Sequence, residues 1–383
     1  MRKVLAIGVG MTKFGKFPDL SVEQLGRDAV WAAMKDAGFR PKDIQVAYLG
    51  NLTESRETGH ISCVAQEILR GVGIRGIPTT RVENACASGS TAIREAWLAV
   101  GSGLYDIALA VGVEKLTGRG PAPLARTGDT LEGIAGFAPP GMWAMRARRH
   151  MAQYGTTVEQ MARVAVKNRR HGRLNPRAQY PKEVTVEEVR SSPMICTPLT
   201  MLDSCPTTDG GAAAILCSEE VAKRYTTKMI YVAAAALQSG TYESTRNIAV
   251  NEIEKRASRE AYEWAGIGPE DLDFAEVHDC FTIAEIVRTE NLGFCKEGEG
   301  GRLVEEGVTA LGGKLPVNPS GGLLCKGHPI GATGVAQVAE LVWQLREEAG
   351  DRQVKGAKVG LAHCSGGFIA QDTGASAVII LKR

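Results

Sequence analysis

The chain has 383 residues, of which 44% are hydrophobic and 23% are charged, and its formal net charge is +2. This length corresponds to two or three domains at about 150 residues each, and the composition is that of an ordinary globular protein. The near-neutral charge gives no reason to expect binding to nucleic acid or to a membrane surface, and no apolar run is long enough to cross a bilayer.

The nine cysteines are odd in number and scattered, without a C-x-x-C pair or a Cys/His cluster at metal-ligand spacing. This usage is typical of free thiols in a reducing compartment, so we expect a cytoplasmic protein with no disulfide framework, no zinc ribbon and no metal site. Arg2 and Lys3 precede an apolar stretch, as in a signal sequence, but glycines interrupt that stretch at once and no cleavage site follows. Residues 3–10 are therefore expected to form a first, buried strand.

The next elements have clear boundary signals. Ser21 stands in the N-cap position of a predicted helix, Gln24 completes a capping box, and Gly38 ends the helix. Residues 43–49 form the next predicted strand, which ends near Gly50.

A strand-to-helix turn carries the first candidate functional residue. The β-prone residues 77–82 precede Cys86, and residues 91–100 follow it with apolar residues at helical spacing. The neighbours of Cys86 are small, so a bulky electrophile could approach its sulfur, and the positive end of the helix would favour a thiolate. The alternative is a buried core cysteine, the commonest environment of this residue, and the local pattern leaves both interpretations open.

Residues 107–113 form another predicted strand, and a different kind of segment follows. From about 117 to 208 the chain is rich in glycine and proline and contains a predicted helix at 158–170, so we expect an insertion that folds over one face of the fold. The basic run 167–173 is either a solvated helix end or a surface for ligand phosphates. Residues 210–217 return to the fold as an apolar strand.

The second half of the chain repeats the order of the first. Residues 265–272 resemble 37–44 at a distance of 228 residues, and a strand and a helix are predicted within 230–264. Two further resemblances follow at distances of 242 and 250 residues, and the first of them places His328 where Cys86 stands. Three such resemblances in the same order indicate two similar α/β halves related by a pseudo-two-fold axis. The matching turns of the two halves would then meet at a shared crevice.

Two histidines in this second half follow turn signals. His278 comes at the end of the predicted strand 274–277, where a structural and a functional role are equally open. His328 is flanked by many glycines, which indicates close backbone approach, and Pro329 is expected to start a helix and to hold the ring. A phosphate-cradling loop is the rival interpretation of the glycines, and it is weaker because the P-loop order of Gly, Lys and Ser/Thr is absent.

A further cysteine, Cys364, follows the predicted strand 359–362 and precedes Gly366 and Gly367. The two glycines would leave backbone N–H groups free to face a ligand. The simpler interpretation is a buried thiol on a turn.

Together these motifs resemble the thiolase superfamily. Cys86 in Asn-Ala-Cys-Ala-Ser-Gly, His278 in His-Asp-Cys-Phe, His328 in Gly-His-Pro and Cys364 in Cys-Ser-Gly-Gly occur in the family's order, and the likeness covers essentially the whole chain. The His-Asp-Cys-Phe version resembles the sterol-carrier-protein-type and archaeal-type branch. The resemblance implies an α/β thiolase fold with five layers, α-β-α-β-α, built from two similar halves and an inserted loop domain.

The corresponding division of the chain has four parts. A first half would occupy 1–116, the loop domain 117–208, a return of the first half 209–228, and a second half 229–383.

The resemblance also implies a role for each matching residue. Cys86 would be the nucleophile that carries the acyl group as a thioester, and His328 would activate it and help to hold a thioester oxygen. His278 would line that first oxyanion hole, and the N–H groups of Cys86 and Gly366 would form the second. Cys364 would be the acid/base that moves a proton at the α-carbon.

Two assignments are less direct. Cys280 in the His-Asp-Cys-Phe motif is a possible second acid/base, because the sterol-carrier-type branch often uses that cysteine, but the glycines after Cys364 favour Cys364. Asn318 and Gly322, in the glycine-rich stretch before His328, are candidates for substrate binding.

The implied activity is the CoA-dependent thiolytic cleavage of a 3-oxoacyl-CoA through a cysteine thioester. The alternatives are a biosynthetic acetoacetyl-CoA thiolase that condenses two acetyl-CoA, an aldolase or ketosynthase on the same fold, and a non-catalytic acyl-CoA-binding subunit. The presence of Cys86, His328 and Cys364 argues against the last two. Coenzyme A is expected as a substrate, with no permanently bound cofactor.

The resemblance further implies a homodimer or homotetramer. Because the chain has no zinc ribbon of its own, there is room for a small OB-fold/zinc-ribbon partner protein that helps to bind acyl-CoA. Glycines, prolines and methionines between Gly133 and Met145 predict a pliable pocket for a bulky or aromatic acyl group.

Overall fold

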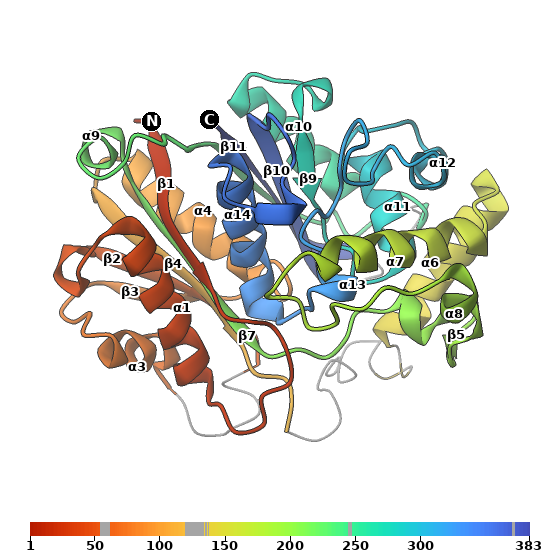
Figure 1. The fold of residues 1–383 in the computed structure, drawn as a ribbon, viewed down its shortest axis with the longest axis horizontal. Coiled ribbons are helices and arrows are strands. Elements are labelled where there is room, and N and C mark those ends of the chain that lie inside the picture. Colours follow the sequence, from red (N-terminus) through yellow and green to blue (C-terminus); the bar gives the residue numbers. More distant parts are fainter. Residues whose placement is uncertain (54–61, 119–133, 135, 137, 244–246, 370–371) are drawn as a thin grey trace.

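The computed structural model describes residues 1–53, 62–118, 134, 136, 138–243, 247–369 and 372–383. Within them, nine strands join into one mixed sheet (Figure 1). Their order across the sheet is β3 (Thr79–Val82), β2 (Val46–Gly50), β4 (Ile107–Glu114), β7 (Gly210–Ser218), β1 (Val4–Met11), β8 (Tyr231–Ser239), β11 (Asp372–Lys382), β10 (Val359–Ile369) and β9 (Phe274–Glu276).

The sheet consists of two similar arrays that meet at a short antiparallel seam between β1 and β8. On each side of the seam the pairings repeat: β2 with β4 and β9 with β10 are parallel, whereas β4 with β7 and β10 with β11 are antiparallel. The repeat extends to the turns. Residues 41–43 and 269–271 both form 3-10 turns, and the helices before them end at Gly38 and Gly266, with left-handed φ of 70° and 62°. The two similar halves expected from the sequence are confirmed.

Helices divide the structure into five layers. The outer face of the first half is covered by α1 (Val22–Ala37) and α3 (Val64–Gly71), and the outer face of the second half by α10 (Glu252–Ala265). Between the halves lie α4 (Ser88–Gly101) and α14 (Thr333–Leu345) (Figure 1). The strands alternate accordingly, so that on β7 one residue faces outward and the next faces the central layer. The expected α-β-α-β-α arrangement is confirmed.

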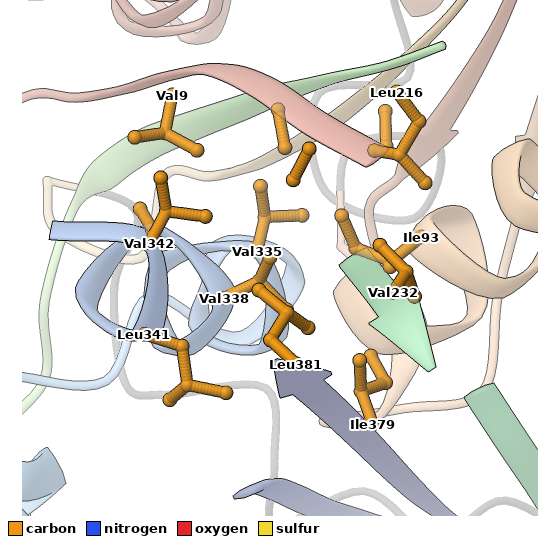
Figure 2. Packing of buried hydrophobic residues seen from close by; sticks show 14 of the residues in the cluster. Val9, Ile93, Leu216, Val232, Val335, Val338, Leu341, Val342, Ile379 and Leu381 are labelled. Carbon is orange, nitrogen blue, oxygen red and sulfur yellow. The ribbon is translucent and has the colours of Figure 1, made fainter. Parts of the chain in front are cut away.

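The central layer is packed from both halves. Val335 and Val338 of α14 lie between Val9 of β1 and Leu381 of β11, and Ile93 of α4 lies beside them next to Val232 of β8 (Figure 2). All of these side chains are buried. Full burial of each large aliphatic side chain contributes about 1.5–3 kcal/mol, so this layer holds the two halves in one fixed arrangement.

Glycines allow the N-terminal ends of α4 and α14 to touch. A Cβ atom built on Gly331 would lie 2.6 Å from the carbonyl oxygens of Gly50 and Val113, and one on Gly89 would lie 2.6 Å from the oxygen of Gly331. No side chain fits at these distances, so the glycines around His328 serve close backbone approach, as expected. The turns that precede the two helices are thereby brought side by side.

The segment between β4 and β7 packs on the second half. It contains α6 (Pro139–Tyr154), α7 (Val158–Arg173), α8 (Val186–Ser191), β5 (Met194–Cys196) and β6 (Leu199–Thr200). Its apolar side chains form one cluster with α11 (Thr282–Asn291), α12 (Gly300–Glu305) and α13 (Gly322–Cys325). The division of the chain at 117 and 208 stays a prediction.

The basic run 167–173 is only partly a solvated helix end. Lys167 is buried and pairs with Glu285 at 3.0 Å, and His171 is buried with its Nδ1 at 3.0 Å from the carbonyl oxygen of Asn318. The arginines of the run keep exposed surface. Half of the run is therefore internal structure that supports the glycine-rich stretch before His328.

Two predicted boundaries are wrong. Residues 41–43 form a 3-10 turn, so β2 starts at Val46 and not at residue 43. Pro329 precedes a 3-10 turn at 330–332, and α14 begins only at Thr333, because the chain must first complete the tight glycine contact with β4.

Among the described residues, no helix has both the length and the apolar character that a membrane span requires. Gly133, in the stretch expected to form an acyl pocket, lies outside the described residues, whereas Pro139 to Met145 form the start of α6.

Gly331→Ala should destabilise the protein, because the added methyl group would overlap the carbonyl oxygens of Gly50 and Val113 and push the turn before α14 away from β2 and β4. Overpacking of this kind typically costs about 1–3 kcal/mol, which a denaturant titration measures as a lower free energy of unfolding. Gly141→Ala is the matched control: a Cβ atom there meets nothing within 4 Å, and the residue lies in α6, so stability should hold or rise. Equal stability of Gly331→Ala and the wild type would contradict the close contact.

Candidate active site

The turn between β3 and α4 presents Cys86 at the junction of the two halves. Ala85, directly before it, has a left-handed φ of 48°, a strained conformation for a residue with a side chain. Ser88 holds the turn, because its hydroxyl accepts the N–H of Asn84 at 2.9 Å and donates to the carbonyl of Ala85 at 2.6 Å. Cys86 keeps part of its surface exposed while Ser88 is buried. The turn thus holds one sulfur in a fixed and reachable place.

His328 approaches Cys86 from the second half. Its backbone N–H donates to the hydroxyl of Thr208 at 3.0 Å. Its Nδ1 lies 2.7 Å from the hydroxyl of Thr333, and that hydroxyl donates to the carbonyl of Pro329 at 3.0 Å. Because a hydroxyl has a single hydrogen, Thr333 accepts the hydrogen bond from Nδ1–H. Nε2 therefore carries the lone pair, which is the state that a general base needs.

His278 is held in the opposite tautomer. The backbone N–H of Ser365 donates to its Nδ1 at 3.1 Å, so the ring hydrogen is on Nε2. That Nε2 is buried and has no hydrogen-bond partner among the described residues. A buried N–H without an acceptor is unfavourable in the resting protein, and it is well suited to bind an oxygen on which negative charge develops.

The three side chains converge at one point. The sulfur of Cys86 and one ring nitrogen each of His278 and His328 lie within 4.8 Å of one another, and the two imidazole rings have centroids 5.0 Å apart. Such a group could hold a metal ion, but the hydrogen on Nε2 of His278 repels a cation and attracts an anion. The geometry therefore fits an oxyanion site better than a metal site.

Cys364 lies beside this group, within a strand. The expected turn position is wrong, because β11 pairs with β10 along its whole length and the strand continues to Ile369. The Cys364 sulfur donates to the carbonyl oxygen of Cys86 at 2.9 Å and lies 3.6 Å from Nδ1 of His278. A second, fully buried thiol is therefore in direct contact with the turn of the first.

Gly366 follows on the same strand and touches the Cys86 turn. A Cβ atom on Gly366 would lie 2.2 Å from the carbonyl oxygen of Asn84 and 2.6 Å from the backbone nitrogen of Cys86. Only glycine fits there. The two backbone segments expected to form the second oxyanion hole are thus in contact.

Cys280 is buried nearby, in the cluster formed by the inserted segment and α11. Burial raises the pKa of its thiol to about 12. Its sulfur makes no hydrogen bond that the described part of the chain shows, whereas its carbonyl oxygen accepts the N–H of Cys205 at 2.9 Å. Cys280 also lies close enough to Cys86 and Cys364 to raise the pKa of both thiols, but hydrogen bonds to Cys86 and His278 are shown for Cys364 alone among the described cysteines.

Burial shifts the pKa values of the site toward the uncharged forms of its side chains. It raises the pKa of the Cys86 thiol and lifts that of Cys364 well above its usual range. It also lowers the pKa of His328 to about 3 and holds that of His278 well below its usual range. Desolvation of Cys86 acts against the thiolate expected at the start of α4, because a helix dipole contributes only about 0.3–1 kcal/mol at most sites.

Asn318 and Gly322 contact the residues on either side of His278. Asn318 accepts the N–H of Val277 at 2.8 Å and donates to Glu285 at 2.8 Å, so both ends of its amide are used inside the fold. A Cβ atom on Gly322 would lie 2.2 Å from a carboxylate oxygen of Asp279. These contacts fit residues that position the His278 turn, and the substrate contact expected of Asn318 and Gly322 stays a prediction.

The sequence did not predict the residues that orient the candidate catalytic histidines. Thr333 and Ser365 set the tautomers of the two histidines, and nothing in their spacing distinguishes them from ordinary helix and strand residues. Glu114 was detectable as a lone acid at the end of an apolar strand. It is fully buried and accepts the N–H of Gly331 at 3.0 Å and that of Thr53 at 3.0 Å, which ties β4 to the His328 turn.

A cysteine, two histidines and a second thiol at the junction of two α/β halves form the arrangement that acyl transfer through a cysteine requires. Comparison with protein families agrees with this class. The family model described as "Thiolase, N-terminal domain" matches residues 4–220, and "Thiolase C-terminal domain-like" matches residues 234–383. The chain therefore belongs to the thiolase family.

Two curated relatives are similar over almost their whole length. An acetyl-CoA acetyltransferase of Methanothermobacter thermautotrophicus is 46% identical, with 100% of each chain covered. The benzoylsuccinyl-CoA thiolase subunit BbsB of Thauera aromatica is 40% identical, with 96% of this chain and 95% of the relative covered. Family membership and these relatives identify the chain as a thiolase-type acyltransferase.

Solved structures share the fold. The Ltp2-ChsH2(DUF35) aldolase has a TM-score of 0.84 at 26% identity and covers 98% of this chain and 97% of that one. Human mitochondrial 3-ketoacyl-CoA thiolase has a TM-score of 0.76 at 18% identity, with 100% and 98% covered.

Proposed function

We propose that this thiolase cleaves a 3-oxoacyl-CoA with coenzyme A through a thioester on Cys86. The observation that carries the proposal is the convergence of Cys86, His278 and His328 within 4.8 Å, with Cys364 on the carbonyl oxygen of Cys86 at 2.9 Å. A nucleophile, a base, an oxyanion donor and a second proton carrier are the four groups that a retro-Claisen cleavage needs.

In the first half-reaction, Nε2 of His328 takes the proton of the Cys86 thiol while the sulfur attacks the 3-oxo carbonyl carbon. The bond between C2 and C3 then breaks, the acyl group stays on Cys86, and the thiol of Cys364 gives its proton to C2, so that acetyl-CoA leaves. The buried Nε2–H of His278 would hold the thioester oxygen of the departing enolate.

In the second half-reaction, the Cys364 thiolate takes the proton of the incoming CoA thiol. The CoA sulfur attacks the thioester, and Cys86 leaves as a thiolate that recovers its proton from His328. The N–H groups of Cys86 and Gly366 would hold the oxyanion of this tetrahedral step, and removing one such donor typically lowers the rate by about 10²–10³-fold.

The same groups would run the reverse condensation of two acetyl-CoA. The name of the Methanothermobacter relative favours that reaction as the second candidate. The equilibrium of such condensations favours cleavage, so degradation is the primary proposal. Rates measured in both directions with one preparation decide between them.

We also propose coenzyme A as a substrate with no permanently bound cofactor, a homodimer or homotetramer, and a reducing, cytoplasmic location in keeping with nine free cysteines. A small OB-fold/zinc-ribbon partner that helps to bind acyl-CoA is part of the proposal, supported by a relative named as a subunit and a structural neighbour solved with a DUF35 protein. If the chain purified alone had full activity, the proposal that it needs a partner protein would be contradicted.

Incubation with 3-oxohexanoyl-CoA, without free CoA, should leave one butanoyl group per chain on the Cys86 peptide, as seen by peptide mass spectrometry. The reason is that the thioester cannot be discharged without a second thiol. Cys86→Ser should carry no adduct. A wild-type chain without any adduct would instead support the acyl-CoA-binding subunit.

Cys364→Ala should lower turnover by about 10²–10⁴-fold, the usual contribution of a positioned acid/base, because Cys364 is the described thiol that hydrogen bonds to Cys86 and lies at Nδ1 of His278. Cys280→Ala, which also removes a buried thiol but not these contacts, is the matched control and should keep most of the activity. Steady-state cleavage of 3-oxohexanoyl-CoA measures both. The reverse ranking would assign the acid/base to Cys280.

A further inference from the structure

The inward face of α6 carries a buried arginine that the proposed reaction does not use. Arg146 is 1% exposed, and its Nε and Nη1 are buried without a hydrogen-bond partner among the described residues. Buried arginines are normally paired, because an unsatisfied buried donor costs about 1–3 kcal/mol, and more when it is charged. An unpaired buried arginine in a native protein therefore requires an explanation, and one explanation is that its free N–H groups bind an anionic ligand.

The surroundings of Arg146 form an aromatic box. Its guanidinium lies 5.0 Å from the ring centre of Trp143 and 5.8 Å from that of Phe368, and Trp143 also stacks on Phe281 at 5.9 Å. Phe281 directly follows Cys280, and Phe368 lies on β10, the strand of Cys364. The box therefore borders the proposed site of carbon–carbon cleavage.

The neighbouring carboxylates are bonded to other donors. Glu254 pairs with Arg288 at 3.2 Å and also accepts from Asn251, Asn291 and Ser365. Asp372 accepts the backbone N–H groups of Thr241, Tyr242 and Thr373. Both acids lower the electrostatic cost of burying Arg146, while the hydrogen bonds shown for them among the described residues go to other donors.

The protonation state of Arg146 permits anion binding. Burial lowers its pKa to about 10, so the guanidinium is still charged at neutral pH. A planar guanidinium with free N–H groups binds a carboxylate with two parallel hydrogen bonds, and the flat rings beside it suit a hydrocarbon body.

We propose that Arg146 binds a carboxylate at the far end of the acyl chain, so that the preferred substrate class is a 3-oxoacyl-CoA with a second carboxylate. Trp143, Phe281 and Phe368 would hold the carbon chain between this carboxylate and Cys86. The inference rests on the proposed thiolase cleavage and names the substrate class of that site.

A phosphate of coenzyme A is the other anion that could reach a buried arginine. The acyl end is the better match, because the box adjoins Cys280 and the strand of Cys364, whereas the phosphates of CoA are separated from its sulfur by the whole pantetheine arm. The two sources differ in a measurable way: a phosphate contact would act on every CoA substrate, and an acyl carboxylate contact only on diacids.

The test compares matched substrates, 3-oxohexanedioyl-CoA with 3-oxohexanoyl-CoA and the corresponding eight-carbon pair. The wild type should cleave the diacid member of at least one pair with a higher kcat/KM by about 10–150-fold, the range expected for a hydrogen bond to a charged group. Arg146→Met keeps an apolar stem over Trp143 and should abolish that preference, while cleavage of the neutral member stays nearly unchanged. Arg148→Met, on the exposed side of α6, is the matched control and should keep the preference.

Thermal unfolding separates binding from a structural role. Because Nε and Nη1 of Arg146 have no hydrogen-bond partner in the described part of the chain, Arg146→Met should be as stable as the wild type or more stable. If the arginine instead had a structural role, the substitution would lower Tm. A wild type that cleaves both members of each pair equally would overturn the inference and leave thiolase activity standing. An equal loss on both members in Arg146→Met, with a raised KM for CoA, would assign the arginine to a phosphate. No cleavage of any substrate would contradict the proposed function itself.

Discussion

The contact between the N-terminal ends of α4 and α14 is the constraint on which the site depends. Each helix belongs to a different half of the chain, and a Cβ atom on Gly334 of α14 would lie 2.4 Å from the backbone nitrogen of Ser90 of α4, a distance that excludes any side chain. The apolar layer around the helices holds them in place, and Glu114 adds a buried hydrogen bond to Gly331 across the same junction. Because the contact is this close, the turn that carries Cys86 and the turn that carries His328 reach one point in space.

The chemistry at that point follows from burial as much as from residue type. Desolvation favours the neutral forms of the thiol and of both imidazoles. The hydrogen bonds from His328 to Thr333 and from Ser365 to His278 give the two rings opposite tautomers. One ring is therefore prepared to accept a proton and the other to donate a hydrogen bond to an oxyanion. The proton transfer from Cys86 becomes favourable only when the substrate brings the carbonyl on which charge develops.

Much of this was predictable from the sequence, and the failures have physical reasons. The repeat, the capping residues of α1 and the clustered glycines identified the two halves and their close approach, because those signals are local and have few alternative causes. The family motifs predicted from the sequence alone that Cys86, His278, His328 and Cys364 share one site. The expectations that did not hold concerned contacts distant in sequence. Burial raises the pKa of Cys86 and so opposes the thiolate expected at a helix end, and Cys364 pairs with β11 within a strand where a turn was expected. The partners Thr333, Ser365 and Arg146 became visible only as contacts.

The most direct test of this account is the ionisation state of Cys86 in the resting protein. The ultraviolet absorbance that thiolates show and thiols lack can be followed against pH as the difference between the wild type and Cys86→Ser, which removes the contribution of the other cysteines. Because burial raises the pKa of this thiol, the difference should stay near zero through neutral pH and grow only in strongly alkaline solution. A full thiolate signal at neutral pH, lost on acidification, would show a resting ion pair and contradict the neutral pair described for Cys86 and His328.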